Sequence, residues 1–155
     1  MTTVAANLEC MAADTRVSNE GVHWHANKIF RIGDSLFGTA GDGFMSLVMI
    51  QWLKGPRSRQ ALYKQWGDYE RGDIWLLELN RDGLFVWDGW GVPEKLIDKR
   101  YAIGSGQQAA IKGLDAGESP EEAVKSAISY DQYSGDPIQV EWLLPPELKP
   151  KRKRG

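Results

Sequence analysis

The stretch TVAANLECMAA, residues 3–13, consists mainly of small and apolar side chains and is interrupted by Asn7-Leu8-Glu9. A polar break between two apolar runs predicts two short strands joined by a tight turn. Further along, residues 28–32 alternate in polarity, and Gly33-Asp34-Ser35 supplies turn residues before the apolar run 36–40. We therefore expect two hairpins, with four short strands, at the start of the chain.

The pattern changes at Asp42. The apolar residues that follow are spaced for a mostly buried helix that ends before Gly55-Pro56; they are Phe44, Leu47, Val48, Ile50 and Trp52. Residues 58–69 predict a second, shorter helix. Residues 73–80 and 84–87 flank Arg81-Asp82-Gly83 and predict another hairpin.

The last third of the chain returns to strands and helices. Residues 101–103 predict a strand that runs into Gly104-Ser105-Gly106, and residues 107–114 a helix. Ser119, Pro120 and Glu122 form a helix-start signal, with the helix ending near Tyr130. Residues 137–143 alternate and predict a closing strand. Grouped strands covered by helices indicate a layered α+β domain.

Composition sets the broad class. A chain of 155 residues with 42% hydrophobic and 26% charged residues fits one folded domain. No apolar run reaches the roughly 20 residues of a membrane-spanning helix, and the first ten residues lack the pattern of a signal peptide. The single Cys10 cannot form an intramolecular disulfide. We expect a cytoplasmic protein.

The charge is divided unevenly along the chain. Residues 145–155 hold five of the 19 basic residues and one of the 21 acidic residues, which leaves 14 basic and 20 acidic residues, or −6, on residues 1–144. We therefore expect a single domain over residues 1–144 and a mobile basic tail over 145–155. The tail has the charge to bind nucleic acid or an acidic partner, but the acidic body argues against nucleic acid.

The first two residues carry candidate chemistry. Met1 is followed by the small residue Thr2, so removal of the initiator methionine is expected to leave threonine as the first residue. An N-terminal threonine combines a hydroxyl nucleophile with an α-amine whose reference pKa is about 7.7 to 8.0. That amine can act as a general base at neutral pH.

Several spaced motifs together resemble the proteasome β-subunit and HslV-type N-terminal nucleophile (Ntn) hydrolase family. The similarity spans most of the chain and rests on six segments: Thr2-Thr3-Val4, Ala12-Ala13-Asp14-Thr15-Arg16, Lys28-Ile29, Gly38-Thr39-Ala40-Gly41, Gly104-Ser105-Gly106 and Asp131-Gln132-Tyr133-Ser134-Gly135. The resemblance implies a four-layer αββα sandwich. It also implies a threonine endopeptidase that needs no cofactor.

The resemblance assigns a role to each catalytic candidate. Thr2 is the nucleophile, and Lys28, held by Asp14, favours the alkoxide and keeps the amine from staying protonated. The amide of Gly41 belongs to the oxyanion hole. Three further residues support the amine: Ser105, Asp131 and Ser134. Without the resemblance, Ser105, Asp131 and Ser134 would be interpreted as ordinary turn and helix-end residues.

The substrate side is also implied by the resemblance. The residues placed near the substrate are Val17, Ser18, Ala26, Phe30 and Gly43, and they suggest an apolar or small side chain next to the cleaved bond. The chain departs from the family in a shorter first hairpin, a shorter total length, and Asp42 where a second glycine is common. We expect Asp42 to cap the following helix, because an acid beside an oxyanion hole would oppose catalysis.

The resemblance also implies partners and leaves two alternative functions. The family implies self-association into a ring or double ring and a peptide or unfolded protein substrate. An ATP-dependent unfoldase is a candidate partner, and no membrane partner is expected. Trp75, Trp87 and Trp90 would suit an interface if exposed. His23 and His25 are too few to hold a metal. The alternatives are a catalytically silent assembly subunit and a non-proteolytic amidase on the same fold.

Overall fold

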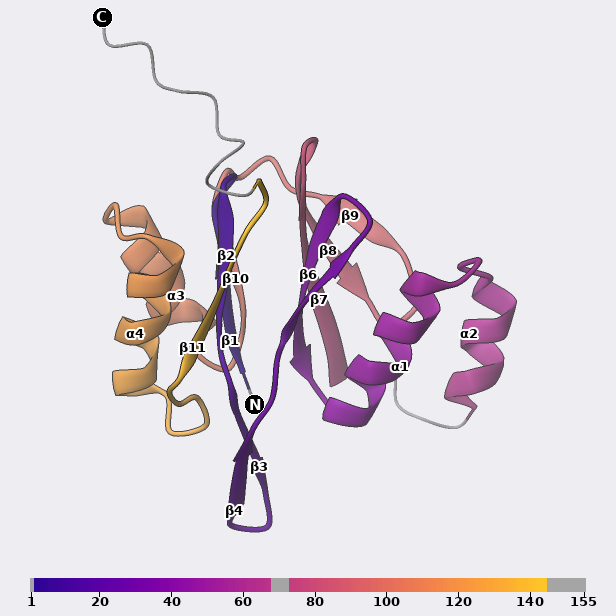
Figure 1. The fold of residues 1–155 in the computed structure, drawn as a ribbon, viewed down its shortest axis with the longest axis horizontal. Helices are drawn as coiled ribbons and strands as arrows, with labels where there is room; N and C mark the ends of the chain where they lie inside the picture. The colour runs from indigo at the N-terminus through magenta and orange to yellow at the C-terminus, as the bar shows by residue number, and fades with distance from the viewer. Residues whose placement is uncertain (1, 68–72, 145–155) are drawn as a thin grey trace, which may run out of the picture.

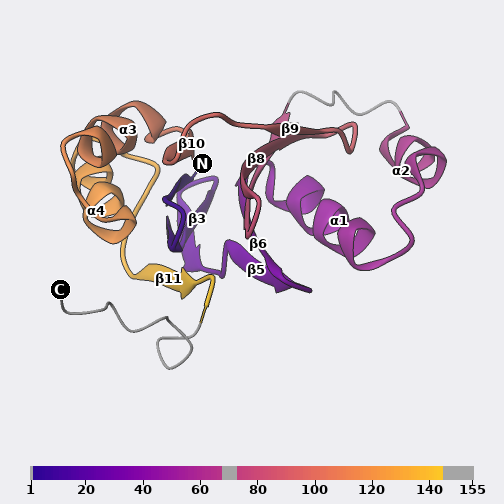
Figure 2. The same ribbon diagram turned by 90° about the horizontal axis from the view of Figure 1, so that it is seen from above.

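The computed structural model describes residues 2–67 and 73–144 as a sandwich of two sheets with a pair of helices on each outer face. Figures 1 and 2 show the layers in the order helices, sheet, sheet, helices. This arrangement confirms the four-layer αββα fold. Met1 and the predicted tail 145–155 lie outside the described residues.

The first sheet is antiparallel, in the order β10-β1-β2-β11. Its strands are β1 (Thr3–Ala6), β2 (Cys10–Asp14), β10 (Tyr101–Gly104) and β11 (Ile138–Trp142). The Asn7 side chain accepts hydrogen bonds from the backbone amides of Glu9 and Cys10, at 2.8 and 2.9 Å, and so closes the turn between β1 and β2. The predicted first hairpin is confirmed.

The second sheet has the order β5-β6-β7-β8-β9. Its strands are β5 (Ile29–Ile32), β6 (Ser35–Gly41), β7 (Ile74–Asn80), β8 (Gly83–Asp88) and β9 (Pro93–Lys95). Both predicted hairpins, β5-β6 and β7-β8, are confirmed. Strand β9 was not predicted, because its three exposed residues, Pro-Glu-Lys, carry no alternation of polarity.

The four predicted helices are present. Helix α1 (Gly43–Lys54) and helix α2 (Arg59–Trp66) cover the second sheet, whereas α3 (Gln107–Asp115) and α4 (Pro120–Tyr130) cover the first (Figure 1). Helix α4 begins with the predicted capping box, in which the side chain of Ser119 accepts from the Glu122 amide and that of Glu122 accepts from the Ser119 amide.

The buried face of α1 differs from the prediction. Phe44 and Leu47, expected inside, are exposed, and the buried residues of the helix are Met45, Ser46, Met49, Ile50 and Leu53. Helix α1 covers a sheet on one side only, so its apolar residues cannot all be buried. Trp87 is a second correction, since it is buried and donates its indole N–H to Glu78 at 3.0 Å, while Trp75 and Trp90 are exposed as expected for an interface.

A separate two-stranded hairpin projects from one end of the sandwich (Figure 1). It consists of β3 (Arg16–Asn19) and β4 (Val22–His25), and all four residues of β4 are exposed. The sequence did not predict β3, because neither strand is buried enough to impose a pattern. Within the described ranges, no helix is long and apolar enough to cross a membrane.

Candidate active site

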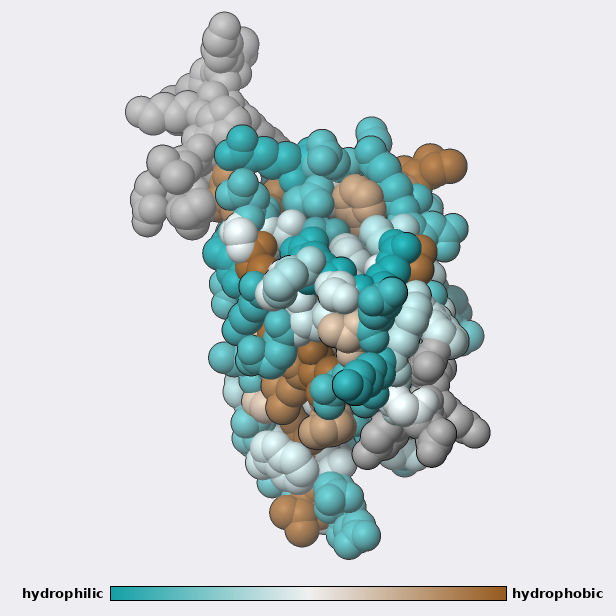
Figure 3. Space-filling model, turned by 90° about the vertical axis from the view of Figure 1, so that its right-hand side faces the viewer, coloured by the Kyte–Doolittle hydropathy of each residue, from teal (hydrophilic) through white to brown (hydrophobic). Residues whose placement is uncertain are grey.

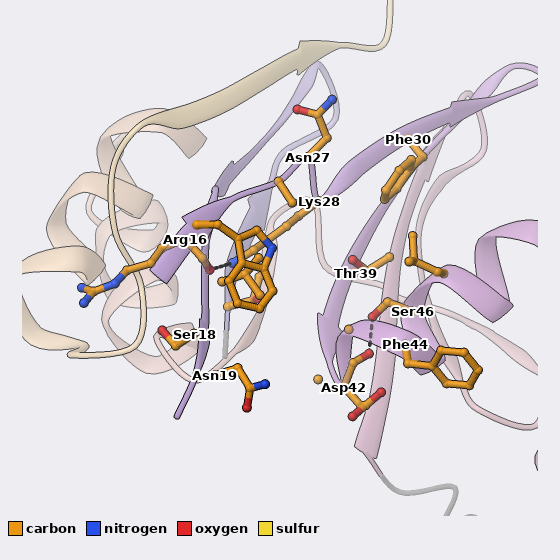
Figure 4. Close-up of a pocket in the computed structure, with 17 residues that line it drawn as sticks. Arg16, Ser18, Asn19, Asn27, Lys28, Phe30, Thr39, Asp42, Phe44 and Ser46 are labelled. Carbon is orange, nitrogen blue, oxygen red and sulfur yellow. Dashed lines mark hydrogen bonds between the residues drawn. The ribbon is translucent and has the colours of Figure 1, made fainter. Parts of the chain in front are cut away.

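A cavity of about 630 Å³ lies beside the β3-β4 hairpin, the end of β6 and the start of α1 (Figure 4). It contains three of the predicted catalytic residues, Thr2, Lys28 and Gly41. All five predicted substrate-binding residues line it too: Val17, Ser18, Ala26, Phe30 and Gly43. Segments that are far apart in the sequence therefore meet at one site.

Lys28 and Asp14 form a buried ion pair next to this cavity. The Lys28 Nζ lies 3.0 and 3.1 Å from the two carboxylate oxygens of Asp14 and 2.6 Å from the carbonyl oxygen of Arg16. Asp14 also accepts hydrogen bonds from the backbone amides of Thr3, at 2.9 Å, and Gly135, at 3.1 Å. The ammonium and the carboxylate are thus held by fixed partners on several sides.

Burial sets the protonation tendency of Lys28. Removal from water disfavours the charged ammonium and lowers the pKa of Lys28 below its usual value, and the attraction and hydrogen bond of Asp14 oppose this shift only in part. The result is a cation that is positioned by Asp14 and yet gives up its proton more readily than a surface lysine.

Ser105, Asp131 and Ser134 form a connected network at the end of the first sheet. The Ser105 amide donates to the Thr2 carbonyl at 2.8 Å, and the hydroxyls of Ser105 and Ser134 both donate to Oδ2 of Asp131. The Ser134 hydroxyl lies 2.8 Å from the Thr3 hydroxyl. The three predicted residues therefore contact one another and the chain at Thr2 and Thr3.

The charge of Asp131 is favoured by these contacts. Burial alone would raise the pKa of Asp131, but the hydrogen bonds from Ser105, Ser134 and the Tyr133 amide outweigh burial and lower that pKa below its usual value. A carboxylate is therefore kept within the network at neutral pH.

Gly41 and Asp42 shape the far wall of the cavity. Gly41 has a φ of +108°, and a Cβ at this position would lie 1.8 Å from the Asp73 carbonyl oxygen, so only glycine fits. The side chain of Asp42 accepts from the Met45 amide at 2.9 Å, which confirms that it caps α1.

Other lining residues were not predicted from the sequence. They are Arg16, Asn19, Trp24, Asn27, Thr39, Phe44, Ser46 and Leu47. Trp24 belongs to the unpredicted hairpin, whereas Phe44 and Leu47 had been placed in the core. Phe44 and Leu47 are three residues apart at the start of a helix, so their spacing shows that they lie on one face of it. The spacing does not show whether that face packs against the sheet or lines the cavity.

His23 is held by its neighbours on the β3-β4 hairpin. His23 lies within hydrogen-bonding distance of the Arg16 guanidinium, at 2.9 Å, and of the Ser18 hydroxyl, at 3.0 Å. Among residues 2–67 and 73–144, no group of three or more His, Cys, Asp and Glu side chains is placed to hold a metal ion.

Comparison with known proteins identifies the class of fold. No protein-family model and no curated protein sequence matches the chain. Solved structures do match, and the chain has the sandwich fold of HslV and proteasome-type peptidases. At 21% to 22% sequence identity, the likeness to these structures concerns the fold alone.

Three of these structures cover nearly the whole chain. Thiobacillus denitrificans BPH in complex with epoxomicin has a TM-score of 0.70 and 21% identity over 93% of this chain and 99% of that chain. Thiobacillus denitrificans BPH has a TM-score of 0.68 and 22% identity over 93% and 98% of the two chains. Eukaryotic HslV from Trypanosoma brucei has a TM-score of 0.65 and 22% identity over 91% and 97%.

Proposed function

We propose that the protein is a threonine endopeptidase whose nucleophile is Thr2 after removal of Met1. The observation that carries this proposal is the buried Lys28–Asp14 pair beside a cavity that Thr2 also lines, in a chain with the HslV-type fold. A buried ion pair contributes little net stability, because desolvation offsets its attraction. A requirement for a positive charge beside the nucleophile would explain why this ion pair is buried here.

In the proposed reaction, the Thr2 hydroxyl attacks the carbonyl carbon of a peptide bond and passes its proton to the Thr2 α-amine. The Lys28 ammonium favours the alkoxide that develops, and the Gly41 amide stabilises the negative oxygen of the tetrahedral intermediate. The C–N bond then breaks, and the leaving amine takes the proton. Water hydrolyses the resulting ester and restores the threonine.

The network around Asp131 is proposed to orient the amine. Ser105 holds the Thr2 carbonyl, and Ser134 contacts the neighbouring Thr3 side chain, so the network restrains the backbone that carries the nucleophile. Asp131 is the acceptor that joins the two serines. Restraint of this kind favours the geometry needed for attack.

The first test is the state of the N-terminus and its reactivity. Intact mass is expected to show loss of Met1. Incubation with epoxomicin, the compound in the Thiobacillus denitrificans BPH complex, is expected to add one inhibitor mass to a peptide that contains Thr2. Thr2→Ala should abolish the adduct and lower peptide hydrolysis by roughly 10⁴-fold or more, while the folded state is retained.

The alternatives give different results in the same experiment. A retained Met1 and an unreactive Thr2 would indicate a silent assembly subunit. Cleavage of small amides without cleavage of extended peptides would indicate an amidase. Lys28→Met keeps the length of the side chain and removes its charge, so full activity of that variant would remove Lys28 from the mechanism.

We also propose self-association into a ring or double ring. The exposed side chains of Trp75 and Trp90 support an interface on the second sheet and its β8-β9 connection. Native mass spectrometry would give the subunit number. We further propose that the protein is cytoplasmic and works with an ATP-dependent unfoldase. Co-purification with an ATPase would test the proposed unfoldase.

A further inference from the structure

The side chain of Gln139 joins the two sheets beside Lys28. Gln139 lies on β11 of the first sheet, and Lys28 directly precedes β5, an edge strand of the second sheet. The Gln139 Oε1 accepts hydrogen bonds from the backbone amides of Lys28, at 2.9 Å, and Ile29, at 3.1 Å. Its Nε2 donates to the Ile29 carbonyl at 3.0 Å. Figure 2 shows β11 and β5 next to each other at this edge of the sandwich.

The carboxamide of Gln139 takes the place of a neighbouring strand along the outer side of β5. A glutamine side chain offers the same kinds of donor and acceptor as a backbone peptide group, so it can pair with a strand edge. On the inner side, the Lys28 carbonyl accepts from the Thr39 amide of β6 at 2.9 Å. The backbone of Lys28 is therefore held by β6 on one side and by Gln139 on the other.

Gln139 is itself attached to the strand that carries Asp14. It pairs with Ala13 of β2, the residue next to Asp14. Both ends of Lys28 are thus bound to one small region of the first sheet, the ammonium to Asp14 and the backbone to Gln139. Residues 26–28 belong to no helix or strand, so individual contacts set the path of the chain before β5.

A lysine needs this second attachment if its ammonium is to act at a fixed point. The side chain is long and flexible, so a contact at its head leaves the position of its backbone open. A small displacement of a catalytic group is enough to slow a reaction strongly. Gln139 lies outside the set of described residues that line the cavity with Thr2, so its route to the reaction runs through Lys28.

We propose that Gln139 is the positioning residue for Lys28. Its carboxamide fixes the backbone of Lys28 relative to Asp14 and so holds the ammonium beside Thr2. The effect on catalysis rests on the proposed peptidase function, whereas the effect on the position of Lys28 does not.

The first measurement is peptide hydrolysis by Gln139→Met, which keeps the approximate length of the side chain and removes the carboxamide. The variant is expected to lower kcat by about 10- to 100-fold, because the ammonium is displaced. KM should stay within about twofold of wild type, because the cavity lining is unchanged. Thermal unfolding shows whether the variant is folded. If it is not, Gln139→Asn takes its place, since it keeps the carboxamide on a side chain one carbon shorter.

The second measurement follows Lys28 without any reaction at Thr2. Acetic anhydride acylates accessible lysine amines, and mass spectrometry of the resulting peptides gives the rate at each lysine. Lys28 is buried and paired and should react slowly, whereas the exposed Lys54 at the end of α1 serves as internal reference. In Gln139→Met, Lys28 should react about tenfold faster relative to Lys54, because loss of buried hydrogen bonds favours local opening.

Arg31→Met is the matched control. Arg31 lies on β5 and donates to the carbonyls of Trp142 and Leu143 at the end of β11, so it joins the same two strands away from Lys28. Its substitution should leave kcat and the acylation of Lys28 near wild type. Gln60→Met repeats the chemical change at an exposed position of α2, on the side of the molecule where Figure 3 shows hydrophilic and apolar side chains interspersed. It should change neither quantity.

The two changes in Gln139→Met must occur together in an active enzyme, and either one without the other would overturn the inference. Equal changes in Arg31→Met would also overturn it, because they would assign the effect to the contact between the strands. If the wild-type protein neither hydrolyses peptides nor reacts with epoxomicin, the peptidase proposal fails. Faster acylation of Lys28 in Gln139→Met would then still support the role of Gln139, and unchanged acylation would overturn it.

Discussion

The two outer interfaces of the sandwich use side chains of very different size. Where α3 and α4 meet the first sheet, most of the buried contacts are alanines, from Ala5, Ala12 and Ala102 on the strands to Ala110, Ala123 and Ala127 on the helices. Where α1 and α2 meet the second sheet, the buried groups are large and include Phe37, Trp66 and Trp87.

This difference follows the division of roles between the sheets. Small side chains let the helices approach the first sheet closely, and on the same sheet Thr3 makes fixed hydrogen bonds with Asp14 and Ser134. The large-residue interface is filled by bulky side chains, and Phe30, which packs against it, also lines the cavity. The two halves of the sandwich thus differ in how they are packed, by small side chains on one side and by bulky ones on the other.

The largest expected effect concerns the buried polar contacts of Asp14. Asp14→Ala leaves the buried Lys28 ammonium without its carboxylate and the amides of Thr3 and Gly135 without an acceptor, and should lower the free energy of unfolding by about 3–5 kcal/mol. Urea denaturation measures this change.

The chain offers a matched control for this prediction. Arg100 and Asp115 form a second ion pair, at 3.1 Å, with both side chains largely exposed. Asp115→Ala should cost less than about 1 kcal/mol, because water screens the pair. Equal costs for the two aspartates would contradict the view that burial fixes the polar site.

An intermediate effect is expected at the small-residue interface. Ala123→Leu places a large side chain where α4 packs tightly on the first sheet and should cost about 1–3 kcal/mol by overpacking. On the other side of the sandwich, Met49→Leu conserves volume and should cost less than about 1.5 kcal/mol. Thermal unfolding of both variants compares how much stability each interface loses on substitution. If Ala123→Leu is as stable as wild type, the contrast between the two interfaces does not hold.

The smallest effect concerns acid stability. The folded-state pKa of Asp131 is lowered, so its charge stabilises the fold above the carboxyl's ordinary pKa near 3.8 and this contribution is lost as pH falls through the lower, folded-state value. Asp131→Asn should therefore be slightly less stable than wild type at neutral pH, and the difference should shrink in acid. Denaturation at pH 7 and near pH 3 measures the difference in the free energy of unfolding between the two proteins at each pH. A difference that is larger near pH 3 than at pH 7 would contradict the prediction.

Most elements could be predicted from the sequence because their signals are local. The Asn7 turn, the β7-β8 hairpin and the Ser119 capping box each depend on residues within a few positions of one another. The hairpin β3-β4 and strand β9 could not be predicted, since exposed strands carry no apolar alternation.

The candidate site was predicted by resemblance and not by spacing alone. Asp14 and Ser105 are common residues in common local settings, and only the order of the motifs connected them. The structure adds their contacts: Asp14 meets Lys28, and Ser105 meets Thr2 and Asp131. The orientation of α1 was mistaken because the sequence marks several apolar residues but not which of them a single sheet can cover.

By itself, the sequence determined the order of the helices and of the buried strands, the capping of α1 and α4, and the residue types available for threonine chemistry. The tertiary structure decided that Lys28 is a buried partner of Asp14 and that Trp24 on one element and Phe44 on another border one opening. The physical reason is that burial and charge pairing depend on groups brought from distant parts of the chain, whereas turns and caps are satisfied by their neighbours.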